Sequence, residues 1–247
     1  MDADELKAAF LSLPPLPSHE SFWEGKRAEL RARVANDDPG AFLTWPTIVS
    51  TMFVADAPYI RDEWDVLYTS GEWGRWKQAV TEDDSGSPTR LPEAPWTSGN
   101  MIHQAYHLLR WEQYTGRRIA GMKSIIEIGG GYGAMAKVAH RAGFEGKYLI
   151  VDVPEFSLLQ EYYLSQCGVE VETKTQLDRK HSPSLLIAMW SLDEMGDLAA
   201  NSHLDLLRPA NVLAAAHSAE IAIGLAARLK AERIEISHLP SNFYLLR

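Results

Sequence analysis

The stretch Ile125-Ile126-Glu127-Ile128-Gly129-Gly130-Gly131-Tyr132-Gly133 decides the fold class. Its first half continues a short apolar run, Ser124–Ile128, that stops at glycines, as a buried parallel strand does. Glycine permits a sharp backbone turn, and because it has no Cβ it lets a ligand approach the start of the next helix. The stretch therefore predicts a strand, a ligand-binding turn and then a helix.

From Lys123 onward, short apolar runs alternate with helical patterns. This alternation predicts an α/β fold with a doubly wound, mostly parallel, Rossmann-like seven-stranded sheet. The last two strands are joined only through Leu239-Pro240-Ser241-Asn242, so they form a hairpin and one terminal strand runs antiparallel. The expected strands are Ser124–Ile128, Lys147–Val151, Val169–Thr173, Ser184–Trp190, Asn211–Ala216, Arg233–Ser237 and Phe243–Arg247, and the expected helices between them are Ala134–Ala142, Phe156–Gln166, Asp197–Leu207 and Ala219–Lys230.

The first half of the chain has a different character, helical and rich in aromatic residues. We predict an N-terminal helical cap or substrate region over residues 1–97 and a Rossmann-like domain over residues 98–247. Within them we expect helices over Ser21–Val34 and Ser98–Tyr114, and a surface loop over residues 81–95. Two interpretations stay open for the tryptophans, which either pack between the two regions or line a substrate cleft. The candidates for the cleft are Trp45, Trp73, Trp76 and Trp96.

Composition narrows the class of partner. A formal net charge of −9, without a run of Lys or Arg, argues against nucleic acid. No apolar run approaches the ~20 residues of a membrane span, and the first ten residues do not have the pattern of a signal peptide. A single cysteine excludes an internal disulfide framework and a cysteine-based zinc cluster. We expect a cytoplasmic protein that acts on a small molecule, and we leave self-association as a homo-oligomer open.

The glycine turn admits two kinds of nucleotide ligand. The spacing of Gly129, Gly131 and Ala134 fits the dinucleotide fingerprint, so NAD is one of them. Glu127 argues against NAD, because a carboxylate at the end of the strand repels a pyrophosphate and attracts the ammonium group of a zwitterionic, sulfonium-bearing ligand. The rest of the chain is also too short for a separate hydride-acceptor domain. We therefore expect S-adenosyl-L-methionine, with a glycine turn that binds no ligand as the alternative.

Asp152 is the second expected contact with the cofactor. It ends the second predicted strand, nineteen positions after Gly133, where a carboxylate can accept hydrogen bonds from both ribose hydroxyls. The alternative is a cap for the helix that follows Pro154. Together, the glycine turn and Asp152 are much more specific than either feature alone.

Five segments of the chain match a known pattern: Ser98–Leu108, Ile126–Gly133, Tyr148–Glu155, Leu159–Leu164 and Ser191–Met195. Together they resemble the sugar O-methyltransferase family, whose members are similar to class I S-adenosylmethionine-dependent enzymes. The resemblance covers about residues 96 to 200. The last third departs from it, since Ala214-Ala215-Ala216-His217 stands where the family has an asparagine–arginine element.

The resemblance implies how the cofactor is held. Glu127 and the glycine turn would bind its methionine end and Asp152 its ribose, while Val153 and the residues near Thr175–Gln176 would border its adenine. Trp190, at the end of the fourth strand, would pack against the cofactor or simply in the core. The expected cofactor contacts are Glu127, Gly129, Gly130, Gly131, Tyr132, Gly133, Asp152, Val153, Asn100 and Trp190.

A sugar hydroxyl is a weak nucleophile, so we expect a general base near the carboxyl ends of the strands. His103 and His107 share one helical face, which Asn100 extends. This pair has three interpretations: a metal site, for which no third ligand is evident; a surface or core pair; or a functional pair in which His103 lies over the cofactor or acts as the base. We predict no metal.

Three further base candidates follow the fourth and fifth strands, where open α/β sheets build their sites. They are Asp193, Glu194 and His217. For Asp193 and Glu194, binding of a substrate hydroxyl and binding of a metal are further interpretations. Glu194 also completes a capping box with Ser191, so a structural role is the alternative. The expected function is O-methylation of a sugar or glycoside. The alternatives are methylation of a non-sugar natural product, a nicotinamide-dependent oxidoreductase, and a catalytically silent protein that kept the fold.

Overall fold

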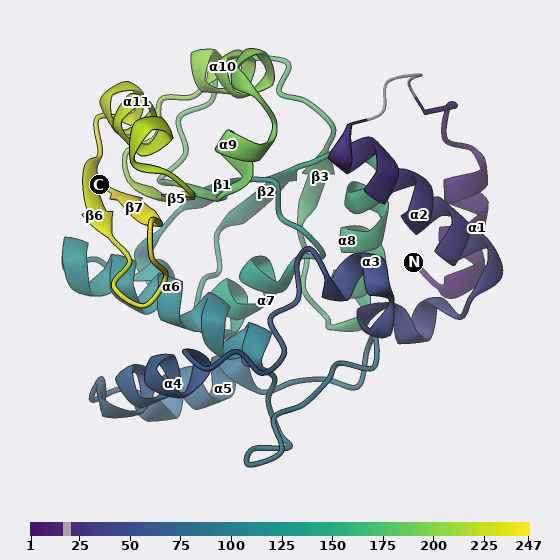
Figure 1. The fold of residues 1–247 in the computed structure, drawn as a ribbon, viewed down its shortest axis with the longest axis horizontal. Helices are drawn as coiled ribbons and strands as arrows, with labels where there is room; N and C mark the ends of the chain where they lie inside the picture. The colour runs from purple at the N-terminus through teal and green to yellow at the C-terminus, as the bar shows by residue number, and fades with distance from the viewer. Residues whose placement is uncertain (17–20) are drawn as a thin grey trace.

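The seven strands form one sheet in the order β3-β2-β1-β4-β5-β7-β6 in the computed structural model, which describes residues 1–16 and 21–247 (Figure 1). Neighbouring strands from β3 to β5 are parallel, and β7 runs antiparallel to both β5 and β6. The predicted fold class is therefore confirmed. The strands are β1 (Ser124–Ile128), β2 (Lys147–Val151), β3 (Glu172–Lys174), β4 (Leu185–Met189), β5 (Val212–Ala216), β6 (Glu232–Glu235) and β7 (Phe243–Leu246).

Helices cover both faces of this sheet, and the sequence sorts its side chains between the faces with a period of two residues. Ile125 joins the apolar cluster on the side of α6, α7 and α8, whereas its neighbour Ile126 joins the cluster under α10 and α11 (Figure 1). The helices are α1 (Ala3–Leu11), α2 (Phe22–Asn36), α3 (Pro46–Val49), α4 (Ile60–Thr69), α5 (Trp73–Val80), α6 (Gly99–Thr115), α7 (Ala134–Arg141), α8 (Pro154–Gln166), α9 (Ser191–Glu194), α10 (Asp197–Leu206) and α11 (Ala219–Leu229), with 3-10 turns η1 (Pro39–Thr44) and η2 (Ile119–Gly121).

Two predicted boundaries around α8 are wrong, for identifiable reasons. The helix begins at Pro154 rather than Phe156, because proline suits the first helical position, where no N–H partner is needed. The strand β3 begins three residues later than expected, because the Val169 N–H donates to the Leu164 carbonyl oxygen at 2.9 Å and so completes the end of α8. Gly168, with φ of +67°, makes the left-handed turn that allows this bond.

Helices α1 to α5 pack outside α6, α7 and α8 and share their hydrophobic cluster (Figure 1). Trp76 and Trp111 are fully buried there, while Trp64, Trp73 and Trp96 pack against one another with ring centroids 5.9 to 6.5 Å apart. Residues on both sides of position 97 therefore contribute to one core, and the domain boundary at 97 stays a prediction. In the described part of the chain, no helix has both the length and the apolar character needed to cross a membrane.

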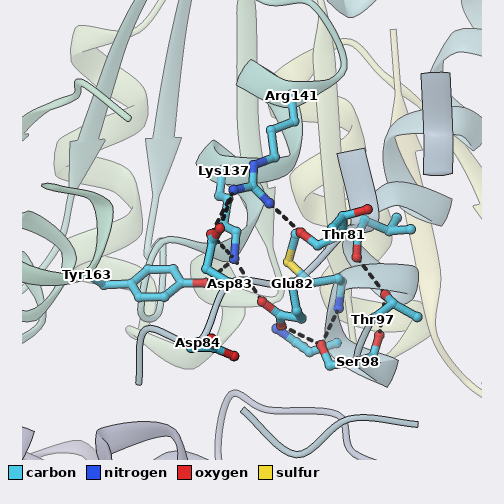
Figure 2. Close-up of polar contacts among 12 residues, drawn as sticks. Thr81, Glu82, Asp83, Asp84, Thr97, Ser98, Lys137, Arg141 and Tyr163 are labelled. Carbon is cyan, nitrogen blue, oxygen red and sulfur yellow. Dashed lines mark hydrogen bonds and ion pairs between the residues drawn. The ribbon is translucent and has the colours of Figure 1, made fainter. Parts of the chain in front are cut away.

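The segment expected as a surface loop, residues 81–95, is partly buried. Figure 2 shows the polar contacts that hold it. Lys137 of α7 is 0% exposed, and its Nζ lies 2.8 Å from Glu82 Oε2, 3.1 Å from Asp83 Oδ2 and 2.8 Å from the Tyr163 hydroxyl. Arg141, one turn later, adds two hydrogen bonds to the Asp83 carboxylate. A buried cation needs such partners, so the polar composition of the loop reflects an internal ion cluster. This cluster fastens the loop to α7, the helix that follows the glycine turn.

Candidate functional site

A cavity of about 790 Å³ opens at the carboxyl ends of the strands. Its walls come from the segments after β1, β2, β3, β4 and β5, from α2, from residues 49–54 and from α6. The chain reverses its direction of winding between β1 and β4, and open α/β sheets bind their ligands at such a reversal. Topology therefore places most of the expected site residues around one cavity, although Gly133 and Asp193 do not border it.

The glycine turn forms the floor of the cavity where β1 leads into α7. A Cβ on Gly129, whose φ is +71°, would lie 2.4 Å from the Cβ of Ser191. Position 129 therefore has no room for a side chain, and the turn packs there directly against the start of α9. Gly131, with φ of +57°, faces Met52 at ordinary contact distance and borders the cavity. The backbone of the turn is thus open to the cavity.

Glu127 is 3% exposed at the end of β1 and still lines the cavity. Its Oε2 accepts a hydrogen bond of 2.8 Å from the Tyr148 hydroxyl, a partner that the sequence did not indicate. Burial raises the pKa of Glu127 to about 7, and the negative charge of Asp152 adds to this rise. A cation bound in the cavity would relieve this unfavourable burial of charge.

Asp152 lies beside the glycine turn and is held from two sides. Its Oδ1 accepts from the Val153 N–H and its Oδ2 from the Gln160 amide, both at 2.8 Å. The same Gln160 amide donates to the Gly131 carbonyl oxygen at 2.9 Å, which ties the carboxylate to the turn. Burial raises the pKa of Asp152 to about 7 against these hydrogen bonds. The cap position of α8 is Val153, without a side-chain cap, so the geometry does not favour helix capping by Asp152.

Asn100 and Tyr132 link α6 to the glycine turn. The Asn100 amide nitrogen donates to the Tyr132 hydroxyl at 2.6 Å, and its amide oxygen accepts from the Val54 N–H at 3.2 Å. Both residues are buried and both border the cavity. Because Asn100 bonds both to Tyr132 and to the Val54 backbone, the two side chains hold the segment near Val54 against the turn.

Helix α2 closes the side of the cavity next to β2. Trp23 borders the cavity and packs edge-on against Phe156 with centroids 5.9 Å apart. Arg27 and Arg31 each donate to the carboxylate of Glu155, with Nε–O distances of 2.7 Å. Burial raises the pKa of Glu155, but these hydrogen bonds outweigh the effect and the pKa lies below its usual value. The sequence did not indicate this wall, because α2 and α8 are far apart along the chain.

His103 belongs to a buried polar chain. Its Nδ1 lies 2.9 Å from Oε1 of Glu63, a carboxylate that also contacts Nε2 of His238 at 2.7 Å. Its Nε2 lies 3.0 Å from Nε2 of His107, whose Nδ1 is 2.6 Å from the Tyr244 hydroxyl. Burial, together with the neighbouring imidazoles, lowers the pKa of His107 well below its usual value. The histidine pair is therefore built into the core.

The buried polar chain occupies both ring nitrogens of His103. The ring borders the cavity, but both nitrogens already face protein partners within hydrogen-bond distance. A general base needs a nitrogen that can reach the acceptor hydroxyl, so this arrangement does not favour His103 for that role. Among the described residues, no group of three or more His, Cys, Asp and Glu side chains is arranged to hold a metal ion.

Three of the separately expected residues form one cluster. Asp193 Oδ2 accepts from the His217 backbone N–H at 2.8 Å and lies 3.1 Å from His217 Nδ1. The Asp193 side chain is 2% exposed, whereas the His217 side chain is 52% exposed and borders the cavity. His217 Nε2 lies 3.8 Å from Glu194 Oε1. A buried carboxylate behind Nδ1 and an accessible Nε2 are the arrangement of a histidine general base.

Of the aromatic residues expected at a ligand site, Tyr132 and Trp190 border the cavity and four tryptophans do not. Trp190 borders it and donates from Nε1 to Asn242 Oδ1 at 2.7 Å. The four tryptophans proposed for a substrate cleft do not border this cavity, because they pack within the helical layer beside the sheet. They are Trp45, Trp73, Trp76 and Trp96. Trp23, which was not among the candidates for a substrate cleft, does border the cavity.

Comparison with known proteins gives distant similarity to methyltransferase structures. No protein-family model and no curated protein matches the chain. An S-adenosylmethionine-dependent methyltransferase from Aquifex aeolicus is 12% identical, with a TM-score of 0.44, over 57% of this chain and 88% of that one. The C-terminal domain of precorrin-6Y C5,15-methyltransferase from Rhodobacter capsulatus is 18% identical, with a TM-score of 0.40, over 70% and 97%. An O-methyltransferase of neocarzinostatin biosynthesis, bound to S-adenosylmethionine and 2-hydroxy-5-methyl naphthoic acid, is 15% identical, with a TM-score of 0.36, over 52% and 45%.

Proposed function

We propose that this protein transfers a methyl group from S-adenosyl-L-methionine to a hydroxyl group of a small molecule. One observation carries the proposal. A single cavity joins two carboxylates, Glu127 and Asp152, on either side of a glycine turn, to a histidine, His217, backed by the buried Asp193. The first pair suits the methyl donor and the second pair suits deprotonation of the acceptor.

The residues around the glycine turn fit the proposed cofactor. Glu127 and Asp152 are carboxylates whose burial is unfavourable without a cation, and S-adenosylmethionine carries an ammonium and a sulfonium. The sheet also departs from the 3-2-1-4-5-6 order of dinucleotide-binding folds, because the antiparallel β7 lies between β5 and β6. Both features favour S-adenosylmethionine over NAD. When bound, the cofactor supplies a methyl group on a sulfonium, which is a good leaving group.

The remaining work falls to the protein. Glu127 would bind the ammonium group, and Asp152 would accept hydrogen bonds from the ribose. His217 would take the proton of the acceptor hydroxyl at Nε2, while Asp193 holds Nδ1–H and stabilises the imidazolium that forms. Since His217 is half exposed, it can release this proton to solvent. The surrounding walls align the reactants and exclude water.

For the acceptor we propose a sugar or a glycosylated small molecule, which the protein would methylate in the cytoplasm. The acceptor class is supported by the resemblance of residues 96 to 200 to sugar O-methyltransferases and by the residues that line the cavity. Trp23 and Phe53 offer ring surfaces to apolar C–H groups, and Gln104 and Glu194 offer polar atoms to hydroxyls. A non-sugar natural product with a hydroxyl group is the second acceptor class, because the same walls would accept it.

The test is an incubation with methyl-labelled S-adenosylmethionine and a panel of nucleotide sugars, glycosides and phenols. We expect labelled product from at least one sugar-containing acceptor, and turnover that His217→Ala reduces ~10²–10⁴-fold. Product from phenols alone would replace the sugar by the second acceptor class. Binding of cofactor without product across the panel would support a catalytically silent protein.

A further inference from the structure

We propose that Trp190 is a positioning residue that sets the Asp193–His217 pair, through a left-handed backbone turn held in place by its indole ring. The inference rests on the proposed function, since it concerns the base of that reaction. It gives Trp190 a role other than cofactor contact or core packing.

The backbone of Trp190 adopts a conformation that large side chains avoid. Its φ is +60° and its ψ is −18°, in the left-handed region. A non-glycine residue held there costs of order 1–3 kcal/mol and persists only where its surroundings fix it. Of the four non-glycine residues with positive φ in the described chain, Trp190 is the one that borders the cavity.

The indole ring has partners on several sides, which explains how the turn persists. The ring of His103 stacks on it with an interplanar angle of 10° and centroids 6.0 Å apart, and His107 approaches it edge-on at 5.4 Å. Its Nε1 donates to Asn242 in the turn between β6 and β7. Glu63 in turn holds His103 through Nδ1. The buried polar chain that leaves His103 unsuited to be a base thus supports the indole.

The turn at Trp190 determines where Asp193 lies. The Trp190 N–H donates to the Ala215 carbonyl oxygen at 3.0 Å, which continues the pairing of β4 with β5. Directly afterwards α9 begins, and the Trp190 carbonyl oxygen accepts from the N–H groups of Asp193 and Glu194 at 3.2 and 3.3 Å. His217 follows the end of β5. A change of φ at Trp190 would therefore rotate α9 away from His217 and separate the two side chains.

The tautomer of His217 reports on this arrangement without substrate or cofactor. An ionised Asp193 only accepts hydrogen bonds, so in the intact pair neutral His217 carries its proton on Nδ1. A histidine side chain that is free in water favours the proton on Nε2. Two-bond ¹H–¹⁵N NMR spectra of the ligand-free protein, at a pH where His217 is neutral, distinguish the two forms.

We would compare wild type, Trp190→Gly, Trp190→Phe and Asp193→Ala, with Trp23→Phe as the control for another tryptophan on the same cavity. Glycine tolerates the left-handed turn but supplies no ring to hold it. Phenylalanine keeps a ring but loses the hydrogen bond to Asn242. We expect Nδ1–H to be the major tautomer in wild type and Trp23→Phe. In Trp190→Gly it should become the minor one, as in Asp193→Ala, with Trp190→Phe between.

An Nδ1–H tautomer that stays dominant in a folded Trp190→Gly would overturn the inference. Urea unfolding of each variant identifies those that are folded, and if Trp190→Gly is not, an unchanged tautomer in Trp190→Phe and in Asn242→Ala has the same meaning. This outcome is independent of the proposed function, because it needs neither methyl donor nor acceptor. Failure of methyl transfer by the wild type would instead contradict the function and leave the geometry as found.

Discussion

Asp193 holds His217 through a single oxygen, since Oδ2 accepts from the His217 backbone N–H at 2.8 Å and from Nδ1 at 3.1 Å. Asp193 lies in α9, which follows β4, and His217 follows β5. The two strands are neighbours in the sheet. The double contact fixes both the position of the backbone and the orientation of the imidazole, and it leaves Nε2 outside this contact, 3.8 Å from Glu194 Oε1.

This relationship predicts the effect of Asp193→Ala. Without the carboxylate, His217 loses its favoured tautomer and the partner that stabilises its protonated form. We expect kcat to fall ~10²–10⁴-fold, the range of an oriented general base, with affinity for S-adenosylhomocysteine within about twofold of wild type. Single-turnover transfer of labelled methyl and calorimetry measure the two quantities. Equal losses in both would mean that Asp193 supports the fold rather than the base.

Asp152→Ala should weaken the binding of the cofactor without disrupting the fold. It removes the proposed ribose contacts, charge-assisted hydrogen bonds worth ~1.5–3 kcal/mol, so the Kd for S-adenosylhomocysteine should rise roughly 10- to 150-fold. Titration calorimetry measures this rise. Asp205→Ala, which removes an exposed carboxylate on α10, is the matched control and should leave the Kd unchanged. An unaltered Kd in Asp152→Ala would remove this residue from the cofactor site.

Cofactor affinity should depend on pH through Glu127 and Asp152. Burial raises the pKa of each to about 7, so both carboxylates lose their protons as the pH rises through neutrality. Ionised Glu127 attracts the ammonium group and ionised Asp152 is the stronger acceptor for the ribose hydroxyls, so affinity for S-adenosylhomocysteine should increase from about pH 5.5 to about pH 8 and then level off. Calorimetry across this range tests the trend, which Asp152→Asn should flatten. Affinity that falls as the pH rises would contradict the assignment.

Glu127 and Asp152 should also make the free energy of unfolding of the ligand-free protein depend on pH. Their pKa values lie above the usual values in the folded state, so the folded protein binds more protons than the unfolded chain between about pH 4 and about pH 7. Their contribution to the free energy of unfolding should therefore decrease as the pH rises through this window. Urea unfolding at several pH values, compared between wild type and Asp152→Asn, measures that contribution. A larger decrease in the variant than in wild type would contradict the assignment.

Glu63→Ala should destabilise the protein more than an ordinary surface change. Glu63 is 1% exposed and serves both His103 and His238. Removing one partner of a buried polar cluster leaves the others unsatisfied, at a cost of about 3–5 kcal/mol in the free energy of unfolding. Glu93→Ala breaks the exposed pair with Arg61 and should cost less than about 1 kcal/mol. Similar urea midpoints for the two variants would show that the buried hydrogen bonds of Glu63 contribute little to the free energy of unfolding.

The sheet was largely predictable from the sequence, because its signals are local. The apolar runs that end at Gly129 and at Asp152 set the bounds of β1 and β2, and the short link before Asn242 required the hairpin. The strand β3 was misplaced because the bond that ends α8 uses Val169, a residue that by composition alone belongs in a strand.

The site was predictable only in part, because side chains from distant segments complete it. Asp193 and His217 were expected separately, and their pairing follows from the adjacency of β4 and β5. The partnership of Glu63 with His103 joins positions forty residues apart, and that of Trp190 with Asn242 joins positions fifty-two apart. No periodicity in the sequence encodes such contacts, which depend on how the helices pack on the sheet.

Calorimetry of the wild-type protein with S-adenosylhomocysteine and, separately, with NAD distinguishes the proposed methyl donor from a dinucleotide. We expect one S-adenosylhomocysteine bound per chain, with an affinity that Asp152→Ala weakens, and no detectable heat of binding from NAD. Binding of NAD without binding of S-adenosylhomocysteine would contradict this expectation.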